Sequence, residues 1–258
     1  MSWRIFHAGM TDVGRQRELN EDVLRVAPDK NLFIVIDGVS GTQGGEVVAN
    51  LAADTLLDHF THTSLETSTC ASIERLLEEG LKLANRRIIE HVEAFPRHRA
   101  SGAVAVAVVF DEDHAHFAHV GDARAYLYRG GKLRSLTRDH TWFNDLLASD
   151  IELTPEGIAY AARYSTVVIR TLGMEASVEV DLGHVELEEG DLFLLCSDGL
   201  HDMIEDDEIA DILARPGAMR EVCDALIGAA NDAGGEDNVT VIAISVQRGL
   251  DLTRGKGA

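Results

Sequence analysis

The chain has 258 residues, of which 45% are hydrophobic, so it is long enough to bury one sizeable core. Its 23 lysines and arginines against 44 aspartates and glutamates give a net charge of −21, which opposes binding to nucleic acid or to anionic membrane surfaces. No apolar run approaches the ~20 residues of a membrane span, and the N-terminus lacks a signal-peptide pattern. We therefore expect a cytoplasmic protein without a membrane partner.

The first part of the chain predicts strands followed by helices. Strand-like stretches cover 3–11, 22–27 and 32–36, and the last is a continuous apolar run of the kind found inside a layered sheet. Apolar residues at three- and four-residue spacing then predict helices over about 44–60 and 72–95. We expect these helices to cover a sheet.

The middle of the chain returns to strands. Segments 103–110, 114–120 and 124–130 are separated by Asp-rich or Gly-containing turns, in the rhythm of an antiparallel meander. Along 114–120, His114 and His116 share one face, and we interpret this segment as a surface strand rather than a metal cluster.

The last part combines a polar insertion with further strands and helices. Residues 138–173 are mixed and partly helical, and strands follow over 178–187, 191–200 and 239–246, around helices at about 205–213 and 218–232. These elements predict one α+β layered domain over residues 1–247, followed by a loose tail at 248–258. Cys70, Cys196 and Cys223 show no metal-type spacing, and we expect buried, reduced thiols.

Aspartates stand at the ends of several strand-like runs, next to Gly or Asn residues that can turn the chain sharply. They are Asp22, Asp37, Asp122, Asp198 and Asp237. One Asp-Gly pair after a strand is usually only a turn, but five such sites from distant positions indicate carboxylates gathered at one edge of a sheet.

Gathered carboxylates repel one another, so they stay ionised together only if a cation joins them. Ligation by oxygen alone selects hard ions such as Mg²⁺ or Mn²⁺, and a two-metal site of this kind can hydrolyse a phosphate ester without a protein nucleophile. The planar fork of an arginine matches the phosphate oxygens, and Arg17 lies just before Asn20-Glu21-Asp22.

Seven motifs occur in order along the chain. They are Arg17-x-x-Asn20-Glu21-Asp22, DGVSGTQGGEVVA at 37–49, SGAVAVAV at 101–108, HVGDARAYLYRGG at 119–131, LTRDH at 136–140, SDGLHD at 197–202 and GGEDNVTVI at 234–242. In order and spacing they resemble the PP2C, or PPM, family of metal-dependent protein phosphatases, especially its compact bacterial members. The resemblance runs from about residue 8 to 246.

The resemblance implies a PP2C-like α-β-β-α sandwich of two antiparallel sheets flanked by helices, with a dinuclear Mn²⁺ or Mg²⁺ centre in a cleft at one end. It implies hydrolysis of phosphoserine or phosphothreonine by direct attack of a metal-activated water. Matched residue by residue, Asp37 would bridge both ions, and the backbone carbonyl of Gly38, Asp198 and Asp237 would complete direct ligation.

The resemblance also assigns roles around this centre. Asp22 would hold metal-bound water, and Asp122 with Asp198 would form a weaker third metal site. Arg17 would bind the substrate phosphate, so that Arg17 and Asp37 are the expected catalytic residues. Asn238 would orient Asp237, and Glu21 would serve the metal waters similarly.

One position departs from the pattern in a way that matters for chemistry. Some relatives carry a His directly after the Asp-Gly of the second motif, proposed to protonate the leaving oxygen, but this chain has Val39. Metal-bound water or another group must then supply that proton.

The segment 139–173 corresponds to the flap that borders the cleft in the bacterial members. Its aromatic residues Trp142, Phe143 and Tyr160 either guide substrate choice or simply pin the flap to the body. The expected partners are phosphorylated proteins and a cognate Ser/Thr kinase with its substrates, and we expect a monomer. The alternative from another class is a pseudophosphatase that binds phosphoproteins without turnover, but the metal-site aspartates that it would lack are all present.

Overall fold

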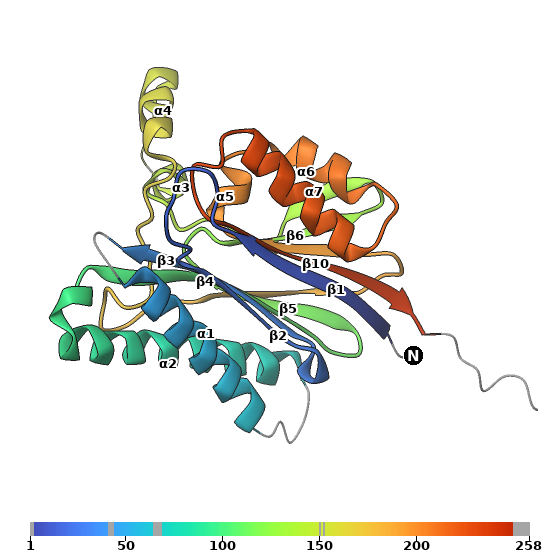
Figure 1. The fold of residues 1–258 in the computed structure, drawn as a ribbon, viewed down its shortest axis with the longest axis horizontal. Helices are drawn as coiled ribbons and strands as arrows, with labels where there is room; N and C mark the ends of the chain where they lie inside the picture. Colours follow the sequence, from blue (N-terminus) through green and yellow to red (C-terminus); the bar gives the residue numbers. More distant parts are fainter. Residues whose placement is uncertain (1–2, 41–43, 64–68, 150, 152, 250–258) are drawn as a thin grey trace, which may run out of the picture.

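The computed structural model describes residues 3–40, 44–63, 69–149, 151 and 153–249. In this part of the chain two five-stranded antiparallel sheets pack face to face, with helices on both outer faces (Figure 1). The predicted α+β class and the sandwich of two antiparallel sheets are therefore confirmed. The first two residues of the predicted domain and most of the predicted tail, 250–258, lie outside the described residues.

The first sheet has the strand order β1-β10-β9-β6-β7. Its strands are β1 (Trp3–Asp12), β10 (Val239–Arg248), β9 (Leu192–Cys196), β6 (Arg124–Arg129) and β7 (Lys132–Ser135). Its outer face is covered by α6 (Asp206–Leu213) and α7 (Met219–Asp232), and the single turn α5 (Asp198–His201) follows β9.

The second sheet has the order β2-β3-β4-β5-β8. Its strands are β2 (Asp22–Ala27), β3 (Leu32–Ser40), β4 (Ser101–Phe110), β5 (His114–Val120) and β8 (Asp181–Glu186). The long helices α1 (Gly45–His62) and α2 (Cys70–Ala94) cover its outer face (Figure 1).

Strand β4 shows how the sequence builds this arrangement. Every residue of β4 is buried, because the strand is central in its sheet and both faces of that sheet are covered. Side chains alternate between faces, so Val104, Val106 and Val108 fill the space between the sheets. Ala103 and Ala105 face the helices instead, where small side chains let α1 and α2 approach closely.

The same alternation aims the acidic residues. In β3, Phe33 and Val35 point between the sheets, and Asp37 follows them on the same face, near the end of the strand. Asp22 is the register partner of Asp37 on β2. Both aspartates are therefore directed at the gap between the sheets.

Several predictions differ from the structure. The short strand β7 was not predicted, because its exposed residues lack an apolar alternation. The strand predicted over 191–200 ends at Cys196, since Asp198 begins α5. Cys196 and Cys223 are buried as predicted, whereas Cys70 is only half-buried, and all three are free.

The interpretation of 114–120 as a surface strand is wrong. Strand β5 lies between β4 and β8, so it has a hydrogen-bonding neighbour on each side. His116 and His119 are 0% and 2% exposed. Pairing with β8, which lies nearly 70 residues later in the chain, makes β5 an internal strand. The three histidines of β5 had suggested an exposed strand instead.

The insertion between β7 and β8 carries α3 (Trp142–Ala148) and α4 (Pro155–Ala161), and α4 extends beyond the sandwich in Figure 1. Short 3₁₀ turns occur at Pro28–Lys30, Pro96–His98 and Ala162–Tyr164. No helix within the described ranges is both long and apolar enough to cross a membrane.

Candidate active site

The five predicted aspartates meet at one end of the sandwich. Asp22 begins β2 and Asp37 lies near the end of β3, while Asp122 follows β5, Asp198 follows β9 and Asp237 precedes β10. The charges of the other four aspartates all act on Asp37, so the five carboxyl groups lie near one another. The fold thus brings together residues that are up to 215 positions apart in the sequence.

The electrostatics of this cluster are unfavourable without a cation. Burial, and then the charges of Asp22 and Asp198, raise the pKa of Asp37 well above its usual range. Burial and the charge of Asp198 raise the pKa of Asp22 and of Asp122 to about 7. Burial and Asp237 raise the pKa of Asp198 to about 6. These carboxyl groups resist ionising together at neutral pH, which divalent cations would relieve.

The residues present fit hard divalent cations. All five side chains offer oxygen ligands, the type that Mg²⁺ and Mn²⁺ prefer. In addition, Oδ1 of Asp198 is buried and has no hydrogen-bond partner among the described residues. A buried carboxylate oxygen without a partner is costly, so it is suited to a metal ligand.

Gly38 is required by close backbone packing beside Asp37. A Cβ atom at this position would lie 2.4 Å from the carbonyl oxygen of Gly45 and 2.8 Å from that of Glu21. The Gly38 amide donates a 3.2 Å hydrogen bond to the same Glu21 carbonyl. Any larger residue would push apart the backbone segments that frame the aspartates.

Asn238 links the loop before β10 to the loop between β1 and β2. Its side-chain Oδ1 accepts a 2.8 Å bond from the amide of Glu21, and its Nδ2 donates 2.9 Å bonds to the carbonyls of Val13 and Leu19. Its own amide donates to Asp237 Oδ1 at 2.8 Å. These contacts fix the Asp237 loop against the segment that carries Arg17.

The side chain of Glu21 has partners at the start of α1. Its Oε1 accepts hydrogen bonds from Ser40 Oγ at 2.8 Å and from the amide of Gly45 at 3.1 Å. Gly45 is the first residue of α1, where unpaired amides and the helix dipole favour an anion. These contacts hold the end of β3 against the helix.

Arg17 lies at the exposed rim of the cluster. Its Nη2 is 2.6 Å from Asp237 Oδ2, and its side chain is 50% exposed. The amides of Arg15 and Gln16 both donate to the carbonyl of Gly235, which holds this loop beside the Asp237 loop. A guanidinium group is therefore available next to the carboxylates and to solvent.

Ser197 is a residue at this site that the sequence reasoning missed. Its hydroxyl donates a 2.6 Å hydrogen bond to Asp22 Oδ2 and accepts one of 3.0 Å from the amide of Thr240. Ser197 is fully buried. The only sequence signal is its place directly before Asp198.

Two histidines to which the sequence assigned no role hold the Asp122 loop. His140 Nδ1 accepts a 3.0 Å hydrogen bond from the amide of Gly121, whose φ of +96° favours glycine. His201 Nε2 lies 3.1 Å from the carbonyl oxygen of Asp122. Both rings act on the backbone of the turn that presents Asp122.

The predicted flap lies next to this end of the molecule through His140. Within it, the ring of Tyr164 packs against Trp142 and Tyr160, each at a centroid distance of 5.7 Å. These three side chains are all more than a third exposed. Trp142 and Tyr160 therefore contact another aromatic residue of the insertion.

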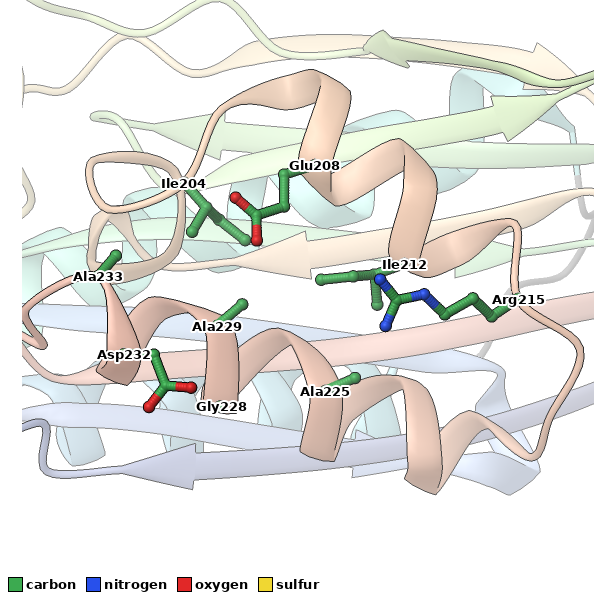
Figure 2. Close-up of a pocket in the computed structure, with 9 residues that line it drawn as sticks. All are labelled: Ile204, Glu208, Ile212, Arg215, Ala225, Gly228, Ala229, Asp232 and Ala233. Carbon is green, nitrogen blue, oxygen red and sulfur yellow. The ribbon is translucent and has the colours of Figure 1, made fainter.

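A separate groove lies between α6 and α7, on the outer face of the first sheet (Figure 2). It is lined mainly by small and apolar side chains, with Glu208, Arg215 and Asp232 at its borders. None of the five clustered aspartates lines this groove, so it is distinct from the candidate active site.

Comparisons with known proteins agree with this geometry. The family model described as "Protein phosphatase 2C" matches residues 14–238. Serine/threonine phosphatase stp of Listeria welshimeri is 35% identical over 249 residues, covering 94% of this chain and 98% of the relative. Protein phosphatase PhpP of Streptococcus pneumoniae is 31% identical, covering 92% and 96%.

Solved structures show the same fold. The Mycobacterium tuberculosis serine/threonine phosphatase PstP/Ppp superposes with a TM-score of 0.84 at 30% identity, covering 95% of this chain and 99% of that one. A structure of the catalytic domain of PstP in complex with two manganese ions gives a TM-score of 0.82 at 30% identity, covering 96% and 100%. The chain belongs to the protein phosphatase 2C family.

Proposed function

We propose that this protein is a metal-dependent protein serine/threonine phosphatase that hydrolyses phosphoserine and phosphothreonine. The observation that carries the proposal is the meeting of five aspartates beside an accessible arginine at one end of the sandwich. Family membership and the named activity of the Listeria and Streptococcus relatives support it.

The residues that would hold two Mn²⁺ or Mg²⁺ ions are Asp37, Asp198 and Asp237, with the backbone carbonyl of Gly38. Asp22 is the register partner of Asp37, and the charge of Asp198 acts on Asp122, so these two carboxylates are close enough to share a third, weaker site. When bound, such ions activate water and neutralise charge on the phosphoryl group. The two manganese ions in the PstP structure support this assignment.

Arg17 would bind the phosphate of the substrate. Its guanidinium is already placed at the rim of the carboxylates by the loop that contacts Gly235. Asn238 would keep Asp237 in place through its amide, and Glu21 would act by fixing the end of β3. The side chain of Val39 has no ionisable proton to donate, so the leaving oxygen must be protonated from another source.

The substrate would be a phosphorylated protein that lies across the cleft and the flap at 139–173. We place the catalytic domain at residues 1–247 and the enzyme, as a monomer, in the cytoplasm, where it would oppose a Ser/Thr kinase. The full set of carboxylates disfavours the pseudophosphatase alternative, because loss of metal ligands would be expected there.

The test is phosphate release from a phosphothreonine peptide with Mn²⁺, with EDTA, and with Asp237→Asn. Asp29→Asn is the matched control, because it makes the same change on an exposed residue of a distant 3₁₀ turn. Release that requires Mn²⁺, persists in Asp29→Asn and disappears in Asp237→Asn supports the enzyme. Tight Mn²⁺ binding without turnover would favour the pseudophosphatase.

A further inference from the structure

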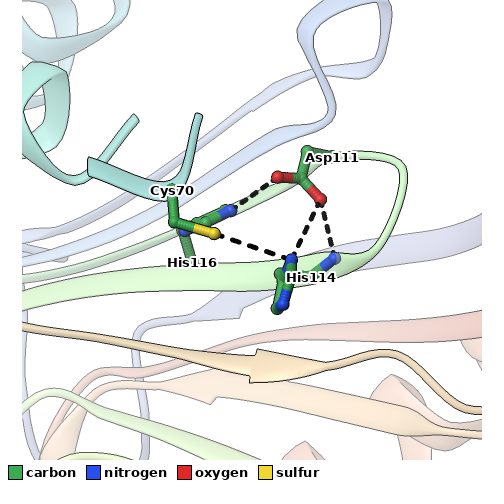
Figure 3. Close-up of side chains that lie close together, drawn as sticks. All are labelled: Cys70, Asp111, His114 and His116. Atoms are coloured by element: carbon green, nitrogen blue, oxygen red, sulfur yellow. Dashed lines mark hydrogen bonds and ion pairs between the residues drawn. The ribbon is translucent and has the colours of Figure 1, made fainter. Parts of the chain in front are cut away.

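A second group of potential metal ligands lies away from the aspartates. It consists of Cys70 at the start of α2, Asp111 in the turn between β4 and β5, and His114 and His116 on β5 (Figure 3). One ligand atom from each residue lies within 4.8 Å of all the others. We propose that these four residues form a zinc site that joins the start of α2 to the second sheet.

The fold explains why these side chains face one another. His114 and His116 are two residues apart on a strand, so they point to the same face of the sheet. That face carries α2, whose first residue is Cys70. Asp111 is fixed because its Oδ1 accepts hydrogen bonds from the amides of Asp113 and His114, at 2.8 and 2.6 Å.

The spacing of the donor atoms suits a tetrahedral ion. Zn–S and Zn–N bonds of about 2.3 and 2.05 Å place a sulfur and a nitrogen ligand about 3.6 Å apart. Cys70 Sγ lies 3.7 Å from His114 Nδ1. His116 Nε2 is 2.8 Å from Asp111 Oδ2, so this pair would separate by about 0.5 Å to reach the ~3.3 Å expected of two tetrahedral ligands.

The imidazole of His116 is 0% exposed, and it faces the proposed site through Nε2. Its Nδ1 is the other ring nitrogen, makes no hydrogen bond within the described part of the chain, and is not the ligand atom. Close by, His184 Nδ1 is 2.7 Å from Glu74 Oε1, and the His184 ring contacts the rings of His114 and His116.

The donor chemistry separates this site from the candidate active site. A thiolate, two imidazoles and one carboxylate favour Zn²⁺ over Mg²⁺ or Mn²⁺, and four protein ligands leave no open position, as in structural zinc sites. The two sites lie at opposite ends of β5, because His114 begins the strand and Asp122 follows its other end. His114 and Val120, the two ends of β5, are six residues apart, which corresponds to about 20 Å along a strand.

Cobalt provides a readout that is independent of phosphatase activity. Reduced full-length protein would be titrated with Co²⁺, which takes the tetrahedral position of zinc and gives a near-ultraviolet charge-transfer band only when a thiolate binds it. We expect one equivalent of this band, its loss on adding one equivalent of Zn²⁺, and its persistence in Asp237→Asn. Cys196 and Cys223 are buried, so Cys70 is the thiol positioned to give it.

Two variants make the proposal falsifiable. Cys70→Ser should abolish the band, and His114→Ala should weaken Co²⁺ binding at least 10-fold, while both keep phosphatase activity. Cys70 and His114 are only partly buried, so both variants are expected to fold. Absence of the band in the wild-type protein at millimolar Co²⁺, or an unchanged band in Cys70→Ser, would overturn the proposal.

Discussion

The hydroxyl of Ser197 donates a 2.6 Å hydrogen bond to Asp22, and this bond joins the two sheets at the candidate metal centre. Asp22 begins β2 in the second sheet, whereas Ser197 follows β9 in the first and also accepts a bond from the amide of Thr240 on β10. The bond therefore holds Asp22 and Asp37, on the second sheet, close to Asp198 and Asp237, which lie beside strands of the first.

Replacing this serine should loosen the centre. Ser197→Ala would leave a buried carboxylate oxygen and a buried amide without their partner, which costs about 1–3 kcal/mol of unfolding free energy. We also expect weaker Mn²⁺ binding. Urea unfolding in EDTA and a Mn²⁺ titration measure the two effects, with the exposed Ser177→Ala as control. Unchanged stability and affinity would show that the bond does not support the centre.

The pKa of Asp122 predicts a gain of stability on removing its charge. Burial and Asp198 raise this pKa from 3.8 to about 7 in the folded protein. The folded state therefore binds the proton more tightly than the unfolded state, and stability falls as pH rises from about 4 through 7. Asn cannot ionise, so in EDTA the Asp122→Asn variant should match the wild type near pH 4 and exceed it at pH 8.

The size of this effect is bounded by the shift. The rise of the pKa of Asp122 from 3.8 to about 7 corresponds to at most about 4 kcal/mol of unfolding free energy, and relaxation of the site will reduce this figure. Unfolding would be followed in urea across this pH range, with Asp29→Asn as the control, whose stability should follow that of the wild type at every pH. If Asp122→Asn is less stable than the wild type at every pH, the carboxylates do not repel as described.

Arg17 should affect the substrate rather than the metal. Arg17→Ala would remove a charge-assisted hydrogen bond to phosphate, worth about 1.5–3 kcal/mol, so kcat/KM should fall about 10–100-fold. Mn²⁺ affinity should stay the same or increase, because Asp237 loses the cation that pairs with it. Steady-state kinetics and a Mn²⁺ titration test this, with Arg15→Ala in the same loop as control. Loss of metal binding in Arg17→Ala would contradict the assigned role.

The exposed aromatic residues of the flap should matter only for large substrates. Tyr164→Ala removes the ring that contacts both Trp142 and Tyr160, so the shape of this surface should change. We expect a several-fold higher KM for a phosphoprotein and no change for a small aryl phosphate. Equal effects on both substrates would mean that the aromatic cluster supports the fold of the cleft instead.

The sequence predicts the parts of this molecule that depend on local pattern. The alternating run at 103–110 forms a central strand. Asp37 lies on the face of β3 that points between the sheets, as the alternation of its side chains predicts. Asp198 lies where an apolar run ends, and such strand ends are where the fold collects the carboxylates.

The rest depends on pairing between distant segments, which one sequence does not reveal. His116 and His119 are buried because β8 pairs with β5. Ser197 contacts Asp22 across 175 positions, and Cys70 meets His114 across 44. No spacing rule along the chain connects these pairs, since the contacts arise only when helices and sheets pack.

Mn²⁺ occupancy and phosphate release should be measured on the same samples of wild type, Asp37→Asn and Asp29→Asn, because these two readouts together test whether the aspartates hold the catalytic metal. The charges of all four other aspartates act on Asp37, so Asp37→Asn should bind Mn²⁺ much more weakly. It should also lose about 10²–10³-fold in turnover of a phosphothreonine peptide, the range seen when an essential electrostatic group is removed. Full turnover by Asp37→Asn, or by the wild type in EDTA, would mean that the aspartate cluster is not a catalytic metal centre.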